Sequence, residues 1–164
     1  MVGKTWFMRQ QEAGMDAKGA GMDDTERAAL NKRLATWAGW RVEQPLARGM
    51  TWRLYAPDGT QANTVSDYGE ALAESEAEAW QHAPDYVGSL DAGMALVPEQ
   101  YAVEIWYARD AFAPDYNYRA RIVPVPFRYH IASGTSDYIG LGDTRAEALA
   151  RALDALRASQ EVGR

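Results

Sequence analysis

The sequence contains no cysteine in its 164 residues. Disulfide bonds, thiolate catalysis and zinc or iron–sulfur sites with cysteine ligands are therefore excluded. Histidine is also scarce, because only His82 and His130 occur, and no serine stands in a nucleophile-elbow context. A serine–histidine–aspartate triad has little support in such a chain. We therefore expect a binding protein, with no cofactor, rather than an enzyme.

Long apolar runs are missing as well. No stretch of about 18 apolar residues could span a membrane, and the first 16 residues hold no apolar segment long enough for a secretory signal. The formal net charge of -6 at pH 7 opposes general attraction to nucleic acid and to anionic membranes. We therefore expect a cytoplasmic protein that binds neither nucleic acid nor membranes directly.

Apolar residues nevertheless make up 47% of the chain, which is enough to bury a sizeable core. A chain of this length most often forms one domain. Residues 1–23 show neither helical nor strand periodicity, so we interpret them as an N-terminal arm. We expect residues 24–158 to form a single domain and residues 159–164 to form a C-terminal tail.

Two helices are indicated by capping signals that precede apolar residues at helical spacing. The first is predicted to begin at Asp23 or Asp24, where Glu26 closes a capping box. The second is predicted to follow Thr144, where Glu147 completes the same motif. The expected apolar stripes are Leu30, Leu34 and Trp37 in the first helix, and Leu149, Leu153 and Leu156 in the second.

Two further helices are expected between these. Asp67 and Glu70 predict a helix that continues to about Gln81, and Ser89 can cap a short helix that ends before Pro98. The earlier helix would carry acidic residues and a histidine at i, i+4 spacing, namely Glu70, Glu74, Glu78 and His82. Ligands spread over three helical turns cannot all reach one ion, so we interpret this set as a solvated acidic face.

Strand-like alternation occupies residues 50–55 and 101–107, and it returns on both sides of the prolines at 124 and 126. We interpret residues 116–133 as a hairpin around those prolines, followed by a short strand over residues 136–141. The expected fold class is α+β, with an antiparallel-rich sheet covered by helices in a layered α/β/α-type sandwich.

Four segments taken in order carry a resemblance to a known family. They are ATWAGW at residues 35–40, TWRLY at 51–55 with its Pro-Asp-Gly turn, SLDAGMALVPE at 89–99, and TRAEALARAL at 144–153. Over roughly residues 24–158 the chain resembles the phage ABA sandwich domain proteins. The resemblance implies a layered α/β/α domain that a phage or prophage encodes and that acts in the host cytoplasm. It carries over no catalytic residue.

The candidate site lies in a segment that is rich in aromatic and basic residues, between positions 101 and 130. If the hairpin forms, strand alternation places several of these side chains on one outward face. The candidate ligand-binding residues are Trp106, Arg119, Arg121, Arg128 and His130. Guanidinium forks match phosphate geometry and aromatic rings stack on bases, so a phosphorylated nucleotide suits this surface. The same pattern also fits a sheet face whose arginines pair with nearby carboxylates.

Two functions follow as expectations. In the first, a non-enzymatic phage accessory protein acts in phage–host conflict by binding and sequestering a small phosphorylated nucleotide signal. In the alternative, an acidic surface inhibits a host nucleic-acid-handling or defence protein through contacts that include Glu70, Glu74, Glu76 and Glu78. Trp6 and Phe7 in the arm, together with exposed aromatic residues, also fit a homo-oligomer.

Overall fold

The computed structural model describes residues 21–44, 51–63, 73–107, 116–125 and 137–162. These residues form an α+β fold with antiparallel sheets, as expected. The elements in chain order are α2 (Asp24–Trp37), β1 (Arg41–Glu43), β2 (Arg53–Tyr55), α3 (Glu76–Trp80), α4 (Leu90–Ala95), β3 (Tyr101–Tyr107), β4 (Tyr118–Pro124), β5 (Tyr138–Gly142) and α5 (Arg145–Val162). Helix α5 thus extends into the segment that was expected as a tail.

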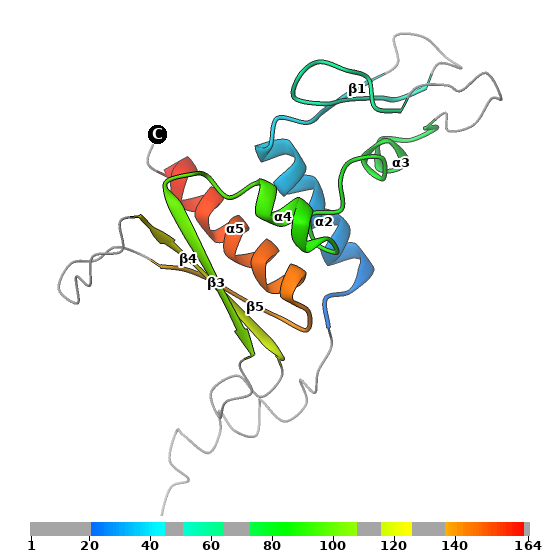
Figure 1. Cartoon of the computed structure of the whole chain (residues 1–164). Coiled ribbons are helices and arrows are strands. Elements are labelled where there is room, and N and C mark those ends of the chain that lie inside the picture. The colour runs from blue at the N-terminus through cyan, green and yellow to red at the C-terminus, as the bar shows by residue number, and fades with distance from the viewer. Residues whose placement is uncertain (1–20, 45–50, 64–72, 108–115, 126–136, 163–164) are drawn as a thin grey trace, which may run out of the picture.

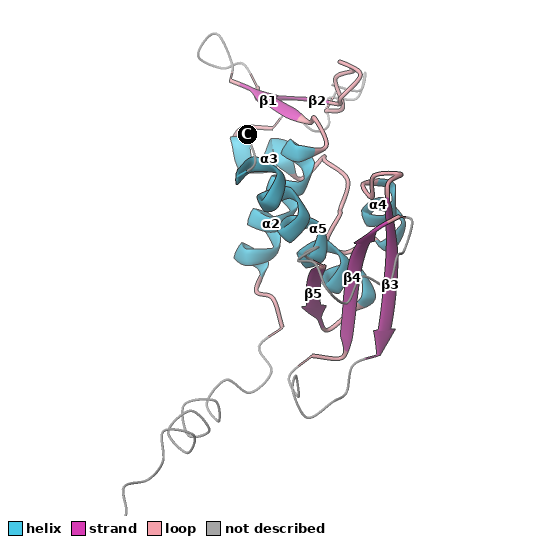
Figure 2. Cartoon of the chain, turned by 90° about the vertical axis from the view of Figure 1, so that its left-hand side faces the viewer, coloured by secondary structure: helices cyan, strands magenta, loops and turns pink. Residues whose placement is uncertain are grey.

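The larger sheet has three strands in the order β3-β4-β5, and both pairings are antiparallel. Helix α5 lies along one face of this sheet with α4 beside it, and α2 packs on the side of α5 away from the strands (Figures 1 and 2). Within the described ranges, the opposite face of the sheet carries no helix. The second helical layer of an α/β/α sandwich is therefore not among these elements.

The core forms where α5 meets the sheet and α2. The leucines expected on the α5 stripe are fully buried, and so are Leu34 of α2 and Ala120 and Ile122 of β4. Leu54 of the small β1–β2 sheet belongs to the same apolar cluster. One continuous core therefore connects the helices to both sheets.

Three of the four expected helix caps are present. The carboxylate of Asp23 accepts a hydrogen bond from the Glu26 backbone N–H at 2.7 Å, and the Ser89 hydroxyl accepts one from the Ala92 N–H at 3.2 Å. At the start of α5, the Thr144 hydroxyl accepts from the Glu147 N–H at 3.1 Å. Each cap satisfies a backbone donor that has no partner inside its helix, which explains why these sequence signals locate the helix starts.

The predicted start of the helix between Asp67 and Gln81 is wrong. Helix α3 begins at Glu76, after Ser75, whose hydroxyl accepts from the Glu78 N–H at 3.2 Å. Just before this cap, the carbonyl of Ala73 accepts a hydrogen bond from the Trp52 N–H at 2.9 Å, in an antiparallel bridge. This bridge requires extended backbone, which interrupts the helix. Asp67 and Glu70 lie outside the described residues.

The predicted hairpin around the prolines also fails to describe the strand partners of β4. Over Tyr118 to Ile122, β4 is hydrogen-bonded to β3 on one edge and to β5 on the other. Both edges of that part of β4 are therefore occupied by described strands, and residues 127–131 of the expected hairpin lie outside the described residues. The adjoining Pro124 ends the strand because proline donates no ladder hydrogen bond.

Candidate functional site

The sequence placed the candidate site on the face of the sheet that points away from the helices. Strand β4 alternates as expected, because Ala120 and Ile122 are fully buried beneath the helices whereas Arg119 and Arg121 are only partly buried. Adjacent strand residues point to opposite faces, so both arginines belong to the outer face of the sheet. Arg128 and His130, which the sequence also assigned to the site, lie outside the described residues.

Trp106 and Arg119 form the centre of this outer face. They are directly opposite each other in the β3–β4 register, and the Arg119 guanidinium carbon lies 5.6 Å from the centroid of the Trp106 ring. The indole is 39% exposed. A cation–π contact of this kind at an exposed site contributes about 0.5–1 kcal/mol. Trp106 therefore lies on the same face of the sheet as Arg119 and Arg121, as strand alternation predicts.

Arg119 has no carboxylate within ion-pair distance in the part of the chain that the structure describes. Its Nε is buried and makes no hydrogen bond. The guanidinium is thus placed by its contact with Trp106 and not by an acidic partner. The N–H donors of this guanidinium are therefore available to bind an anion, because no ion pair among the described residues occupies them.

Arg121 is placed differently, although it lies on the same face. Its guanidinium forms ion pairs with Glu104 at 3.5 Å and with Asp137 at 2.7 Å. Glu104 and Asp137 balance its positive charge. Arg121 therefore fits the alternative interpretation, in which the arginines of this face pair with nearby carboxylates. Ile139, opposite Arg121 on β5, is 41% exposed and adds an apolar flank. The outer face therefore combines the Arg119 guanidinium, which has no acidic partner among the described residues, with aromatic and aliphatic surface.

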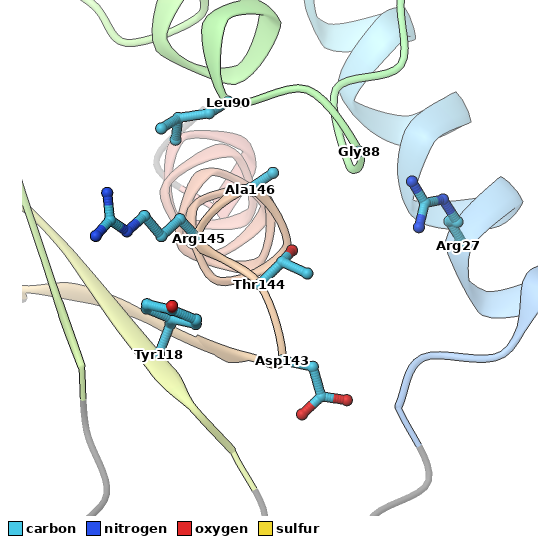
Figure 3. Close-up of a pocket in the computed structure, with 8 residues that line it drawn as sticks. All are labelled: Arg27, Gly88, Leu90, Tyr118, Asp143, Thr144, Arg145 and Ala146. Atoms are coloured by element: carbon cyan, nitrogen blue, oxygen red, sulfur yellow. The ribbon is translucent and has the colours of Figure 1, made fainter.

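A hollow of about 480 Å³ lies on the helix side of β4 (Figure 3). Its lining comes from α2, the loop before α4, α4 itself, β4 and the beginning of α5, and consists of Arg27, Gly88, Leu90, Tyr118, Asp143, Thr144, Arg145 and Ala146. The sequence analysis missed this hollow because these segments are far apart along the chain. The one available signal was the inward position of Tyr118 in the strand alternation.

An aromatic contact positions the Arg145 side chain at one side of this hollow (Figure 3). The Arg145 guanidinium carbon lies 5.7 Å from the centroid of the Tyr118 ring, and Tyr118 in turn meets Tyr107 edge to face at 5.5 Å. Arg27, on the α2 side, forms an ion pair with Asp85 at 3.2 Å. The hollow therefore contains two guanidinium groups, of which Arg145 has no carboxylate partner among the described residues.

The acidic side chains that the rival hypothesis requires are partly engaged within the molecule. Glu76 forms an ion pair with Lys32 at 2.5 Å and accepts from the Trp80 indole N–H at 3.1 Å. Hydrogen bonds from Lys32 and from Trp80 lower the pKa of the Glu76 carboxyl. The Glu78 carboxylate accepts from the Glu74 backbone N–H at 2.7 Å. In the described ranges, no group of three histidines or acidic residues is arranged to hold a metal ion.

None of the helices in the described parts of the chain is both long enough and apolar enough to cross a membrane. Comparison with known proteins was also negative: no protein-family model, no curated protein and no solved structure matches this chain. Its function therefore has to be inferred from its own residues and their geometry.

Proposed function

We propose that this protein is a non-enzymatic binding protein that sequesters a small phosphorylated nucleotide on the outer face of its three-stranded sheet. The observation that carries the proposal is the pair of Trp106 and Arg119, which lie side by side on adjacent strands. The tryptophan offers an aromatic surface for a base, and the guanidinium offers hydrogen-bond donors for a phosphate. Nucleotides combine both groups.

The two arginines of this face have different roles in the proposal. Arg119, which has no acidic partner in the described structure, contacts the phosphate. Arg121 is held between Glu104 and Asp137 and connects β3 to β4 next to the site, so it acts as a positioning residue. Arg128 and His130 belong to the proposed site only on the basis of strand alternation in the sequence, since they lie outside the described residues.

The biological setting is proposed from the sequence. The four motifs that resemble the phage ABA sandwich proteins support a phage or prophage origin, and sequestration of a nucleotide signal would counter a host defence in the host cytoplasm. In this structure the motif residues serve the fold: Ser89 caps α4, and Gly39 ends α2 with a φ of 95°.

The alternative, inhibition of a host protein by an acidic surface, has weaker support. The carboxylates of Glu76 and Glu78 are hydrogen-bonded within the molecule, so a basic partner would compete with contacts that already exist. We therefore favour nucleotide binding over the inhibitor.

The proposal is tested by a thermal-shift screen of the purified full chain against mononucleotides, cyclic dinucleotides and ADP-ribose. A ligand that binds only the native state raises the melting temperature. Trp106→Ala and Arg119→Ala should each weaken binding roughly tenfold or more, because stacking on an aromatic ring contributes about 1–3 kcal/mol per base. Arg119→Lys keeps the charge but loses the fork and should bind with intermediate affinity.

The matched control is Arg53→Ala, because Arg53 is an exposed arginine on β2 in the other sheet. This variant should bind as tightly as the wild type. Failure of every nucleotide to shift the melting temperature would refute the proposal. So would an undiminished shift in both the Arg119→Ala and the Trp106→Ala variants.

A further inference from the structure

Strand β3 forms an outer edge of the three-stranded sheet, because its one strand partner among the described residues is β4. The backbone N–H of Val125 donates to the carbonyl of Gln100 at 2.8 Å, which makes these two residues a hydrogen-bonded pair. Hydrogen-bonded pairs recur at every second residue along an antiparallel ladder. Ala102, Glu104 and Trp106 therefore bond to β4, and the N–H and C=O groups of the intervening residues point away from the sheet.

Those outward groups belong to Tyr101, Val103, Ile105 and Tyr107. The Tyr101 N–H donates to the carbonyl of Pro98 at 2.9 Å. In the described parts of the chain, no backbone group is hydrogen-bonded to the outward groups of Val103, Ile105 and Tyr107. A row of unpaired donors and acceptors along an extended strand is a template for a further strand.

The β3 edge also lacks the features by which proteins usually protect the edge of a sheet. Such features are lysine, proline, a bulge or a very short strand. Strand β3 is seven residues long, pairs with β4 in one continuous register, and carries Glu104 as its single charged residue. On the opposite edge of the sheet, the Leu141 carbonyl of β5 already accepts a hydrogen bond from the Arg151 side chain at 3.1 Å. The sheet is therefore more readily extended at β3 than at β5.

The side chains of these edge residues are incompletely covered by the helices. Val103 and Ile105 point to the helix side of the sheet and are only partly buried, whereas Ile122, opposite Val103 on β4, is fully buried. The difference arises because α5 packs mainly against β4 and β5 (Figure 2). Tyr107, at the end of β3, is 55% exposed. A strand added beside β3 would cover this apolar strip.

The sequence of β3 is complementary to itself when two copies run antiparallel. With a two-fold axis beside Ile105, this residue faces its own counterpart, and Val103 faces the partner's Tyr107. Both are hydrogen-bonded pairs, because the outward backbone groups of these residues meet. On the outer face, Trp106 then lies opposite the partner's Glu104. Apolar residues thus meet apolar residues on the helix side, and the single charge of the strand meets an indole.

Charge selects this register over its neighbours. A shift by one step in one direction places Glu104 directly opposite the partner's Glu104, and like charges at that distance are destabilising. A shift in the other direction leaves Val103 without a partner in β3. In the register centred on Ile105, Trp106 lies between the partner's Glu104 and Arg119, which has no acidic partner among the described residues. The interface is therefore complementary in charge as well as in polarity.

We propose that this protein is a dimer in which the β3 strands of two copies pair antiparallel about Ile105. The two three-stranded sheets then form one continuous sheet. Because the two-fold axis is perpendicular to that sheet, the helices of both copies lie on one face and both outer faces lie on the other. The inference does not depend on the proposed nucleotide site, since Trp106 and Arg119 lie on adjacent strands of the same copy.

Sedimentation equilibrium of the full chain measures the dimer and should give twice the 18.2 kDa of one chain. Tyr107→Lys places a charge on the edge and should raise the dimer dissociation constant at least about tenfold. Ile105→Pro removes an outward N–H that does not bond to β4, and it should weaken the dimer as much. The matched control is Ile139→Lys on β5, which also charges an exposed apolar position and should leave the dimer intact.

Cysteine cross-linking determines the register, because the chain has no cysteine of its own. Ile105→Cys lies beside the two-fold axis, within the separation that a disulfide spans, and should link to itself. Glu104→Cys and Trp106→Cys should not link when each is alone, and they should link when the two variants are mixed. Val162→Cys, at the exposed end of α5, is the control and should stay unlinked.

A monomeric mass at about 100 µM chain would overturn the inference. So would a dimer that Tyr107→Lys leaves intact, and this variant should keep the far-ultraviolet circular dichroism of the wild type because Tyr107 is exposed. Self-linking of Glu104→Cys would overturn the register about Ile105. A monomer that still binds a nucleotide through Trp106 would contradict the dimer and leave the proposed function standing.

Discussion

Gly140 shows how a single residue sets the distance between two elements. It lies in the middle of β5, which continues through it. A Cβ atom at this position would collide with backbone atoms of Ala148 and Ala152 in α5. The absence of a side chain therefore allows α5 to lie directly against β5.

Gly140→Ala should consequently destabilise the protein strongly. The new methyl group meets helix backbone, which cannot move aside as a flexible side chain could, so the free energy of unfolding should fall by about 3 kcal/mol. Chemical denaturation with urea measures this change.

The control is Gly59→Ala, where no atom lies within 4 Å and only the φ of 88° opposes a side chain. That strain costs about 1 kcal/mol. Equal stability losses in the two variants would contradict the close-approach explanation for Gly140.

At the level of elements, Asp154 connects α5 to α2. Its carboxylate accepts hydrogen bonds from Arg33 of α2 at 2.9 Å and from Arg157 of its own helix at 2.9 Å. Burial acts to raise the pKa of Asp154, but the hydrogen bonds and charges of Arg33 and Arg157 outweigh it and hold that pKa below its ordinary value. The charged form is therefore favoured in the folded state.

This predicts a pH-dependent effect of Asp154→Asn. A carboxyl whose folded pKa is depressed stabilises the fold above its unfolded pKa, and this contribution disappears as the pH falls through the folded pKa. Near pH 7 the variant should be roughly 1–2 kcal/mol less stable, which is typical of hydrogen bonds to charged groups. The difference should shrink below about pH 4, the ordinary pKa of aspartate.

Urea denaturation of both proteins across this pH range provides the measurement. The exposed Asp91 of α4 serves as a control, and Asp91→Asn should change stability little at any pH. A stability difference for Asp154→Asn that stays constant down to pH 2 would be inconsistent with this linkage.

At the scale of the whole molecule, the apolar core is shared by elements that are distant in sequence. Leu54 of the small sheet and Leu153 of α5 are both fully buried in the same cluster. The indole N–H of Trp40 also donates to the hydroxyl of Tyr86 at 3.0 Å, which connects the start of the small sheet to the loop before α4. The small sheet is therefore part of the main body rather than an appendage.

A core of this kind predicts a single cooperative unfolding transition. Leu54→Ala should lower the free energy of unfolding by about 2–5 kcal/mol, as truncation of buried leucines generally does, and should shift the whole transition. Thermal melts followed in the near and far ultraviolet should coincide.

Val162→Ala is the matched control, because Val162 is 90% exposed at the end of α5 and its truncation should change stability by less than about 0.5 kcal/mol. Separate transitions in the two spectral regions would mean that the small sheet unfolds on its own.

The candidate site could be predicted from the sequence only in part. Alternation along β4 was enough to place Arg119 on the face away from the core, and the pairing of β3 with β4 then brought Trp106 beside it. Pairing of the arginines with carboxylates was one of the two interpretations, but the partners of Arg121, which are Glu104 and Asp137, could not be predicted because they depend on which residues face each other across three strands. The hollow around Arg145 escaped prediction for the same reason.

The sequence by itself determined where α2, α4 and α5 begin and which faces of α5 and β4 are buried. Caps such as Asp23 and Thr144 act on backbone groups within one helical turn, and apolar periodicity acts within one element, so both are readable locally. Only the tertiary structure decided that β4 pairs with β3 and β5. It also decided that α3 begins after the bridge at Ala73, and that charged residues from distant segments line one hollow. These outcomes depend on contacts between segments far apart in the chain, and such contacts are selected by how the whole core packs.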